Sequence, residues 1–104
     1  MEAMFAEAGM EMVVRVRPSD IASEDSRLAF MKAVIVQLAA AKPRVVVFDI
    51  AGNDLLSSGT LGAFLRFRRS GIKVALRNAS YHVMEILERT NLTGLFDVQT
   101  DPNG

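Results

Sequence analysis

The segment that most limits how this chain can fold is a near-continuous apolar run, Arg44-Val45-Val46-Val47-Phe48-Asp49-Ile50. Its apolar residues do not alternate with polar ones, so a strand formed here needs cover on both faces. Strands of that kind stand at the centre of sheets that are flanked by helices. The run therefore predicts an α/β protein in which residues 45–50 form a central strand.

Extended and helical patterns alternate around this run. Further strands are predicted at residues 12–17, which Pro18 closes, and at 73–78, with edge strands at 1–9, turning at Gly9, and at 97–100. Helices are predicted between the strands, from the N-cap Ser23 to Pro43, from Ser57 or Ser58 to about residue 69, and from the N-cap Ser80 to Asn91. This order favours parallel strands with a functional crevice beyond their carboxyl ends.

The first predicted helix carries two neighbouring apolar lines. Residues Leu28, Met31, Ile35 and Leu38 recur at helical spacing, and Phe30, Val34 and Ala41 form a second line beside them. We take the first line as the core face, which predicts that Ile35→Ala costs about 2–5 kcal/mol of folding free energy.

Length and composition indicate one globular domain that spans residues 1–104. The 12 basic and 12 acidic residues balance, and the only dense basic cluster is at residues 66–69, so nucleic acid is not expected as a partner. The chain has no cysteine, which excludes a disulfide framework and cysteine-ligated zinc. A start without signal-peptide features and apolar runs too short to span a bilayer predict a cytoplasmic protein without membrane insertion.

Motifs of common enzymes are missing from the sequence. It contains no GxxxxGK[ST] phosphate loop, no GxGxxG fingerprint and no GxSxG elbow, and its one histidine, His82, is interpreted as a helix-surface residue. Asp49 ends a strand, as a phosphate-accepting aspartate does, but the first strand lacks the acidic pair that would hold magnesium. Asp49 and Asp54 are therefore interpreted as loop residues or caps. We expect no catalytic residue, no cofactor and no bound metal.

A run of small and hydroxyl residues, Ser57-Ser58-Gly59-Thr60, opens the second predicted helix at the crevice. Taken alone, it is explained by N-capping, because serine and threonine side chains satisfy the free N–H groups of a helix start.

Three segments stand out together: Asp49-Ile50-Ala51-Gly52-Asn53-Asp54-Leu55-Leu56-Ser57-Ser58-Gly59-Thr60-Leu61-Gly62, Leu76-Arg77-Asn78-Ala79-Ser80, and Ile86-Leu87-Glu88-Arg89-Thr90-Asn91-Leu92-Thr93-Gly94-Leu95-Phe96. In this order and spacing they resemble the STAS domain family of anti-sigma factor antagonists. The resemblance covers roughly residues 10 to 100. It implies a STAS-like fold, a mixed sheet of four or five strands with helices mainly on one face.

The resemblance also implies a switch. The family's phosphorylated serine matches Ser58, and the neighbouring site would include Asp49, Ser57, Gly59 and Thr60. The sequence differs from the family pattern because Ser57 replaces its aspartate, Gly59 its second small residue and Thr60 its glycine.

The function implied is that of a non-enzymatic regulatory module, an anti-sigma factor antagonist in a partner-switching pathway. Its partner would be an anti-sigma factor, a serine-protein kinase of the histidine-kinase-like ATPase type. The expected contact surface comprises Asn53, Asp54, Leu55, Leu56, Leu61, Arg66, Phe67 and Asn78. The main alternative is a non-phosphorylated scaffold subunit of an ABC-type lipid transporter or of a larger signalling assembly. A weaker alternative is a sensor of a small ligand or nucleotide.

Overall fold

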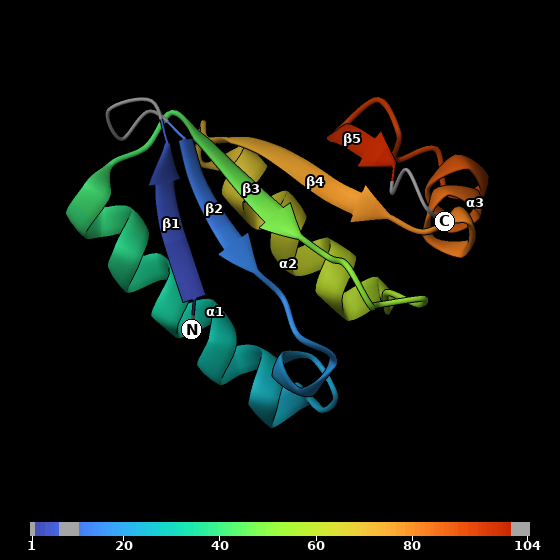
Figure 1. The fold of residues 1–104 in the computed structure, drawn as a ribbon, viewed down its shortest axis with the longest axis horizontal. Coiled ribbons are helices and arrows are strands. Elements are labelled where there is room, and N and C mark those ends of the chain that lie inside the picture. The colour runs from blue at the N-terminus through green and yellow to red at the C-terminus, as the bar shows by residue number, and fades with distance from the viewer. Residues whose placement is uncertain (1, 7–10, 101–104) are drawn as a thin grey trace.

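The computed structural model describes residues 2–6 and 11–100 of the chain. In these ranges the chain forms one sheet with three α-helices and a short 3-10 helix (Figure 1). In chain order the elements are β1 (Glu2–Ala6), β2 (Glu11–Arg15), η2 (Pro18–Asp20), α1 (Glu24–Ala41), β3 (Val45–Asp49), α2 (Ser58–Arg69), β4 (Lys73–Ala79), α3 (Tyr81–Arg89) and β5 (Asp97–Thr100).

The strands follow one another in the sheet in the order β1-β2-β3-β4-β5. Strands β2 to β5 are parallel, and β1 pairs with β2 in the antiparallel direction. The α/β class predicted from the sequence is confirmed, and the apolar run of residues 45–49 is the middle strand. The turn expected at Gly9 lies outside the described residues.

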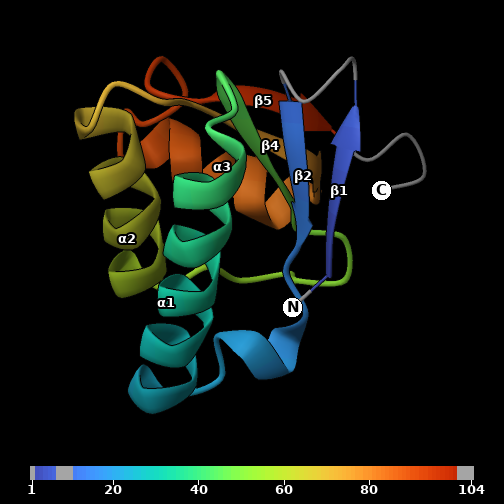
Figure 2. The ribbon, with the colours of Figure 1, turned by 90° about the vertical axis from the view of Figure 1, so that its left-hand side faces the viewer.

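The main core lies between one face of the sheet and the three helices. Figure 2 shows α1 and α2 on one side of strands β1 and β2. Alternate residues of β2, β3 and β4 point into it, and the rings of Phe48 and Phe64 stack at its centre with their centroids 4.2 Å apart. The ring of Phe67, also in α2, has its centroid 5.9 Å from that of Phe48. Aromatic pairs of this kind add stability beyond the area that they bury.

The opposite face of the sheet carries a smaller buried cluster of Val13, Val47 and Ala75. On the edges of this cluster, Arg77 of β4 pairs with Glu11 of β2 at 3.2 Å, so the ion pair reaches across β3. Both side chains are about one-third exposed, and such pairs contribute little to stability.

The face of α1 that enters the core is not the one predicted from the sequence. Phe30, Val34 and Leu38 are buried, whereas Leu28 is 48% exposed and Ile35 is 54% exposed. The predicted core line is therefore wrong at Leu28 and Ile35, whereas Leu38 is buried and the half-buried Met31 packs against the core. Two apolar lines lie side by side on this helix, and their spacing alone does not select between them because both have a helical period.

The helix ends agree with the sequence signals. Ser23, Ser57 and Ser80 are N-caps, each with a side-chain oxygen that accepts a hydrogen bond from the backbone three residues later. Asn91 has the left-handed backbone (φ 59°) that was predicted for it. The start of α2 is thereby located at Ser57 and Ser58.

Candidate functional site

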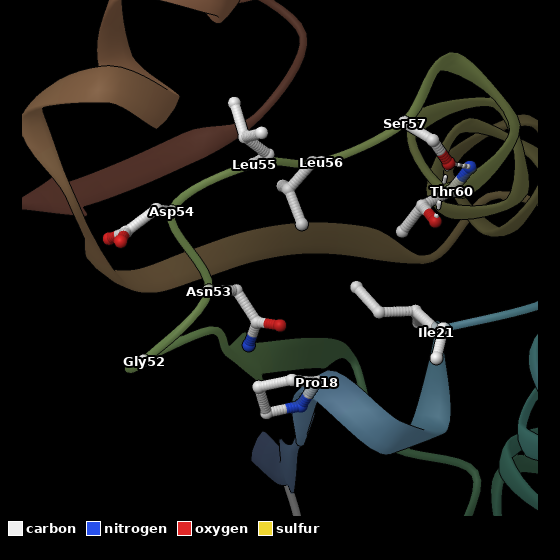
Figure 3. A pocket seen from close by; sticks show the side chains of 10 residues that line it. Pro18, Ile21, Gly52, Asn53, Asp54, Leu55, Leu56, Ser57 and Thr60 are labelled. Carbon is white, nitrogen blue, oxygen red and sulfur yellow. Dashed lines mark hydrogen bonds between the residues drawn. The ribbon is translucent and has the colours of Figure 1, made fainter.

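The candidate site lies where the carboxyl ends of β2, β3 and β4 meet the loop that leads into α2. A hollow of about 550 Å³ opens there between η2 and this loop (Figure 3). Pro18, Ile21 and Ala22 line one side, and Gly52 to Ser57 with Thr60 line the other. The end of the sheet at which the sequence predicts a crevice is therefore hollowed.

Asn53 holds the loop in place. Its side chain is buried, and Nδ2 donates hydrogen bonds to the backbone oxygens of Val16, at 2.8 Å, and Ile50, at 3.3 Å. The first bond joins segments 37 residues apart and ties the loop to the end of β2. In Figure 3 the Asn53 side chain points toward the side of the hollow formed by Pro18 and Ile21, while Asp54 points away from it.

The start of α2 uses two of its hydroxyl groups internally. The Ser57 Oγ accepts a hydrogen bond from the Thr60 backbone nitrogen at 3.1 Å and lies 3.0 Å from the Thr60 hydroxyl. Thr60 itself is buried. Ser58 is the first residue of the helix and is exposed, and within residues 11–100 no hydrogen bond to its side chain is found. Of the three hydroxyls, the one of Ser58 is thus available to a partner molecule.

The electrostatic setting of this helix start favours an anion. The first turn of α2 contains no acidic residue, and the N-terminal end of a helix carries a partial positive charge. The guanidinium of Arg27 lies against Gly59, so that a Cβ added to Gly59 would stand 2.9 Å from its Cζ. A cation from α1 therefore lies beside the residue that follows Ser58. The sequence did not reveal this contact, because the two positions are about thirty residues apart and no local signal joins them.

The structure divides the predicted contact residues into two groups. Asp54, Leu55 and Arg66 are exposed and Asn78 is half-buried. The other four predicted contact residues are buried: Asn53, Leu56, Leu61 and Phe67. Their assignment to a contact surface is therefore corrected. Phe67 was expected to be exposed, and the expectation fails because the core ring Phe48 packs against it.

Asp49 lies at the start of the loop, and His82 lies on α3. Asp49 is half-buried and accepts hydrogen bonds from the Ala51 backbone nitrogen and from Asn78. It thus acts as a cap of the loop, as the sequence suggested. His82 is exposed on α3, with its ring 6.4 Å from that of Tyr81. Within the described part of the chain, no group of three His, Cys, Asp or Glu side chains is placed to hold a metal ion.

Comparisons with known proteins add no family assignment. No protein-family model matches the chain, and no curated protein matches it at a significant level. Among the helices of residues 11–100, none has the length and apolar character needed to cross a membrane.

Proposed function

We propose that this protein is a regulatory protein-binding module of the STAS type, and that phosphorylation of Ser58 controls its binding surface. The observation that carries the proposal is the division of the hydroxyls at the start of α2. Ser57 and Ser58 are both exposed, but the Ser57 hydroxyl is engaged with Thr60, whereas no hydrogen bond to the Ser58 side chain is found within residues 11–100. A modifying enzyme requires an accessible hydroxyl, and a fold tolerates a new charge where no buried neighbour must move.

The fold is suited to accept the phosphate without rearranging. Phosphorylation adds about −1.5 to −2 charges. The free N–H groups of α2 and the nearby Arg27 guanidinium both favour negative charge at this end of the helix. The cost of the phosphate therefore falls on a partner that packs over the loop, because it has to bury the charge or withdraw.

The loop supplies a surface for such a partner. Leu55 is 73% exposed, although a large aliphatic side chain usually avoids water, and Asp54 beside it is exposed too. The buried Asn53 and Leu56 on either side hold the loop in shape. The partner in this proposal is an anti-sigma factor, a serine-protein kinase of the histidine-kinase-like ATPase type, and the protein is its antagonist.

The test uses wild-type protein, Ser58→Ala and Ser58→Asp as baits in the native host, with captured proteins quantified by mass spectrometry. Wild type and Ser58→Ala should retain a common partner, and Ser58→Asp should retain at least about tenfold less of it, since 1.4 kcal/mol of lost affinity is tenfold. Phosphate should be found on Ser58 in cells.

Ser57→Asp is the matched control. It adds the same charge one residue earlier, in the N-cap position, where aspartate caps as well as serine. It should therefore keep the fold, and it should keep the partner because the STAS family pattern has an aspartate at this position. If Ser58→Asp captures the partner as well as wild type does and Ser58 carries no phosphate in cells, the switch is refuted and the non-phosphorylated scaffold takes its place.

A further inference from the structure

A second surface of the molecule, which begins beside the α2 start at Gly59 and Arg27 and continues along α2, has the properties of a docking groove. It runs between α1 and α2 on the side turned away from the sheet, where Figure 2 shows the two helices side by side. Two hollows of about 440 and 510 Å³ lie along it and share Ile35, Arg66 and Phe67, so they form one continuous groove. From Arg27 to Leu38 the groove follows α1 for about 16 Å, or three helical turns.

The floor of the groove is apolar because most of the first apolar line of α1, predicted as the core face, remains uncovered. Leu28 and Ile35 are about half exposed, and Met31 between them is half-buried. From α2, Gly62 and Leu65 complete the floor. Exposed aliphatic side chains that repeat at helical spacing along a groove are the usual docking surface for an amphipathic helix.

The rim of the groove is positively charged. Arg27, Arg66 and Arg69 line it against the single carboxylate Glu24, an excess of two positive charges (three minus one). None of the three arginines forms an ion pair within residues 11–100. The whole chain has no net charge, so the excess of positive charge along the groove is local.

From these features we infer that the groove binds an amphipathic helix of a partner protein, with aliphatic side chains on one face and Asp or Glu along its flanks. The aliphatic side chains fill the floor, and the acidic ones pair with the arginines. A second copy of this chain is the poorer occupant, because a two-fold contact would bring the same arginines of both copies together. A nucleic acid is poorer too, because its phosphates make polar contacts and leave the aliphatic floor unused.

Gly62 offers a test that does not endanger the fold. A Cβ at this position meets nothing within 4 Å, so a larger side chain projects into the open groove. Replacing a glycine inside a helix also raises helix propensity. Gly62→Leu should therefore block the groove while the protein remains at least as stable as wild type, and Gly62→Ala is the matched variant whose side chain is too small to block it.

The probe is a set of fluorescein-labelled amphipathic peptides of about 14 residues, or four turns, with leucines at helical spacings and glutamates on the flanks. Fluorescence anisotropy should show saturable binding that weakens with added salt. Gly62→Leu should lower the affinity at least about tenfold, and Gly62→Ala should change it less than about threefold. Arg66→Glu combined with Arg69→Glu should also abolish binding, and peptides with lysine in place of glutamate should not bind.

Other outcomes overturn the inference. One is that no glutamate peptide of the set binds the wild type. A second is that Gly62→Leu binds the glutamate peptides as tightly as the wild type does. Another is a concentration-dependent dimer in analytical ultracentrifugation that Gly62→Leu removes, since this would make a second copy the occupant. A labelled DNA or RNA duplex that binds the wild type and not the arginine variants would identify a nucleic-acid surface instead.

Discussion

The side-chain amide of Asn78 donates a hydrogen bond to Oδ1 of Asp49 at 3.0 Å, which joins the carboxyl ends of β4 and β3. The same Oδ1 accepts a bond from the Ala51 backbone nitrogen at 3.1 Å, so one carboxylate organises both the strand end and the loop that follows. Asn78 has a left-handed backbone (φ 62°) at a point where the pairing of β4 with β5 shifts register. Asparagine tolerates this backbone better than most residues.

Two substitutions at Asn78 separate the backbone effect from the hydrogen bond. Asn78→Gly loses only a bond to a charged acceptor, which is worth about 1.5–3 kcal/mol. Asn78→Ala loses the bond and also places a Cβ in the left-handed region, which adds about 1–2 kcal/mol. Urea unfolding should therefore rank wild type above Asn78→Gly and Asn78→Gly above Asn78→Ala. Equal stability of the two variants would show that the backbone at residue 78 carries no strain.

Asn53 and Asp54 are neighbours with opposite roles in the loop. Asn53→Ala removes two donors from a buried position and leaves the Val16 carbonyl without its partner, at a cost of about 1–3 kcal/mol. Asp54→Ala changes an exposed side chain and should stay within about 0.5 kcal/mol of wild type. Chemical denaturation of both variants is the measurement. If Asp54→Ala lowered the free energy of unfolding as much as Asn53→Ala does, Asn53 would not be the residue that holds the loop.

Two leucines of α1 test which face of this helix is the core face. Leu38 is 8% exposed and Leu28 is 48% exposed. Leu38→Ala should cost about 2–5 kcal/mol, as buried leucines do. Leu28→Ala, and Ile35→Ala likewise, should cost no more than about 0.5 kcal/mol. A cost of about 2–5 kcal/mol for Leu28→Ala and for Ile35→Ala as well would restore the core line predicted from the sequence.

The two glycines of α2 differ in what an added methyl group meets. Gly62→Ala meets open space and should raise the free energy of unfolding by up to about 1 kcal/mol, the helix-propensity difference between the residues. Gly59→Ala has to displace the Arg27 guanidinium and should gain less. Thermal unfolding of both variants measures the difference. A larger gain for Gly59→Ala would mean that Arg27 does not lie against the helix start.

The charge tolerance of the α2 start can be measured without a partner. Ser58→Asp adds a negative charge to the first turn and should stabilise the fold by about 0.3–1 kcal/mol. In an Arg27→Met background the gain should be smaller, because a nearby cation is gone, and a double-mutant cycle gives the coupling. A destabilisation above about 1 kcal/mol by Ser58→Asp would show that its side chain takes part in the fold, which would argue against the proposed switch.

The candidate site was predictable where it depends on local chain chemistry. The end of β3 at Asp49 and the N-cap Ser57 follow from residues close in sequence, since a cap bonds to a backbone group three residues away. The place of Ser58 at the first residue of α2 follows from the same cap. The burial of Phe67 and the position of Arg27 were not predictable, because both depend on the packing of α2 against β3 and α1.

The order of strands and helices along the chain, the central place of residues 45–49 and the ends of the helices can be read from the sequence alone. They depend on the hydrophobic period and on hydrogen bonds between near neighbours. The folded structure was needed to show which apolar line of α1 is buried and that Asn53 is an anchor instead of a contact residue. Both outcomes depend on partners that are distant in the sequence, because α1 contacts α2 and Asn53 contacts Val16 only after the sheet has formed.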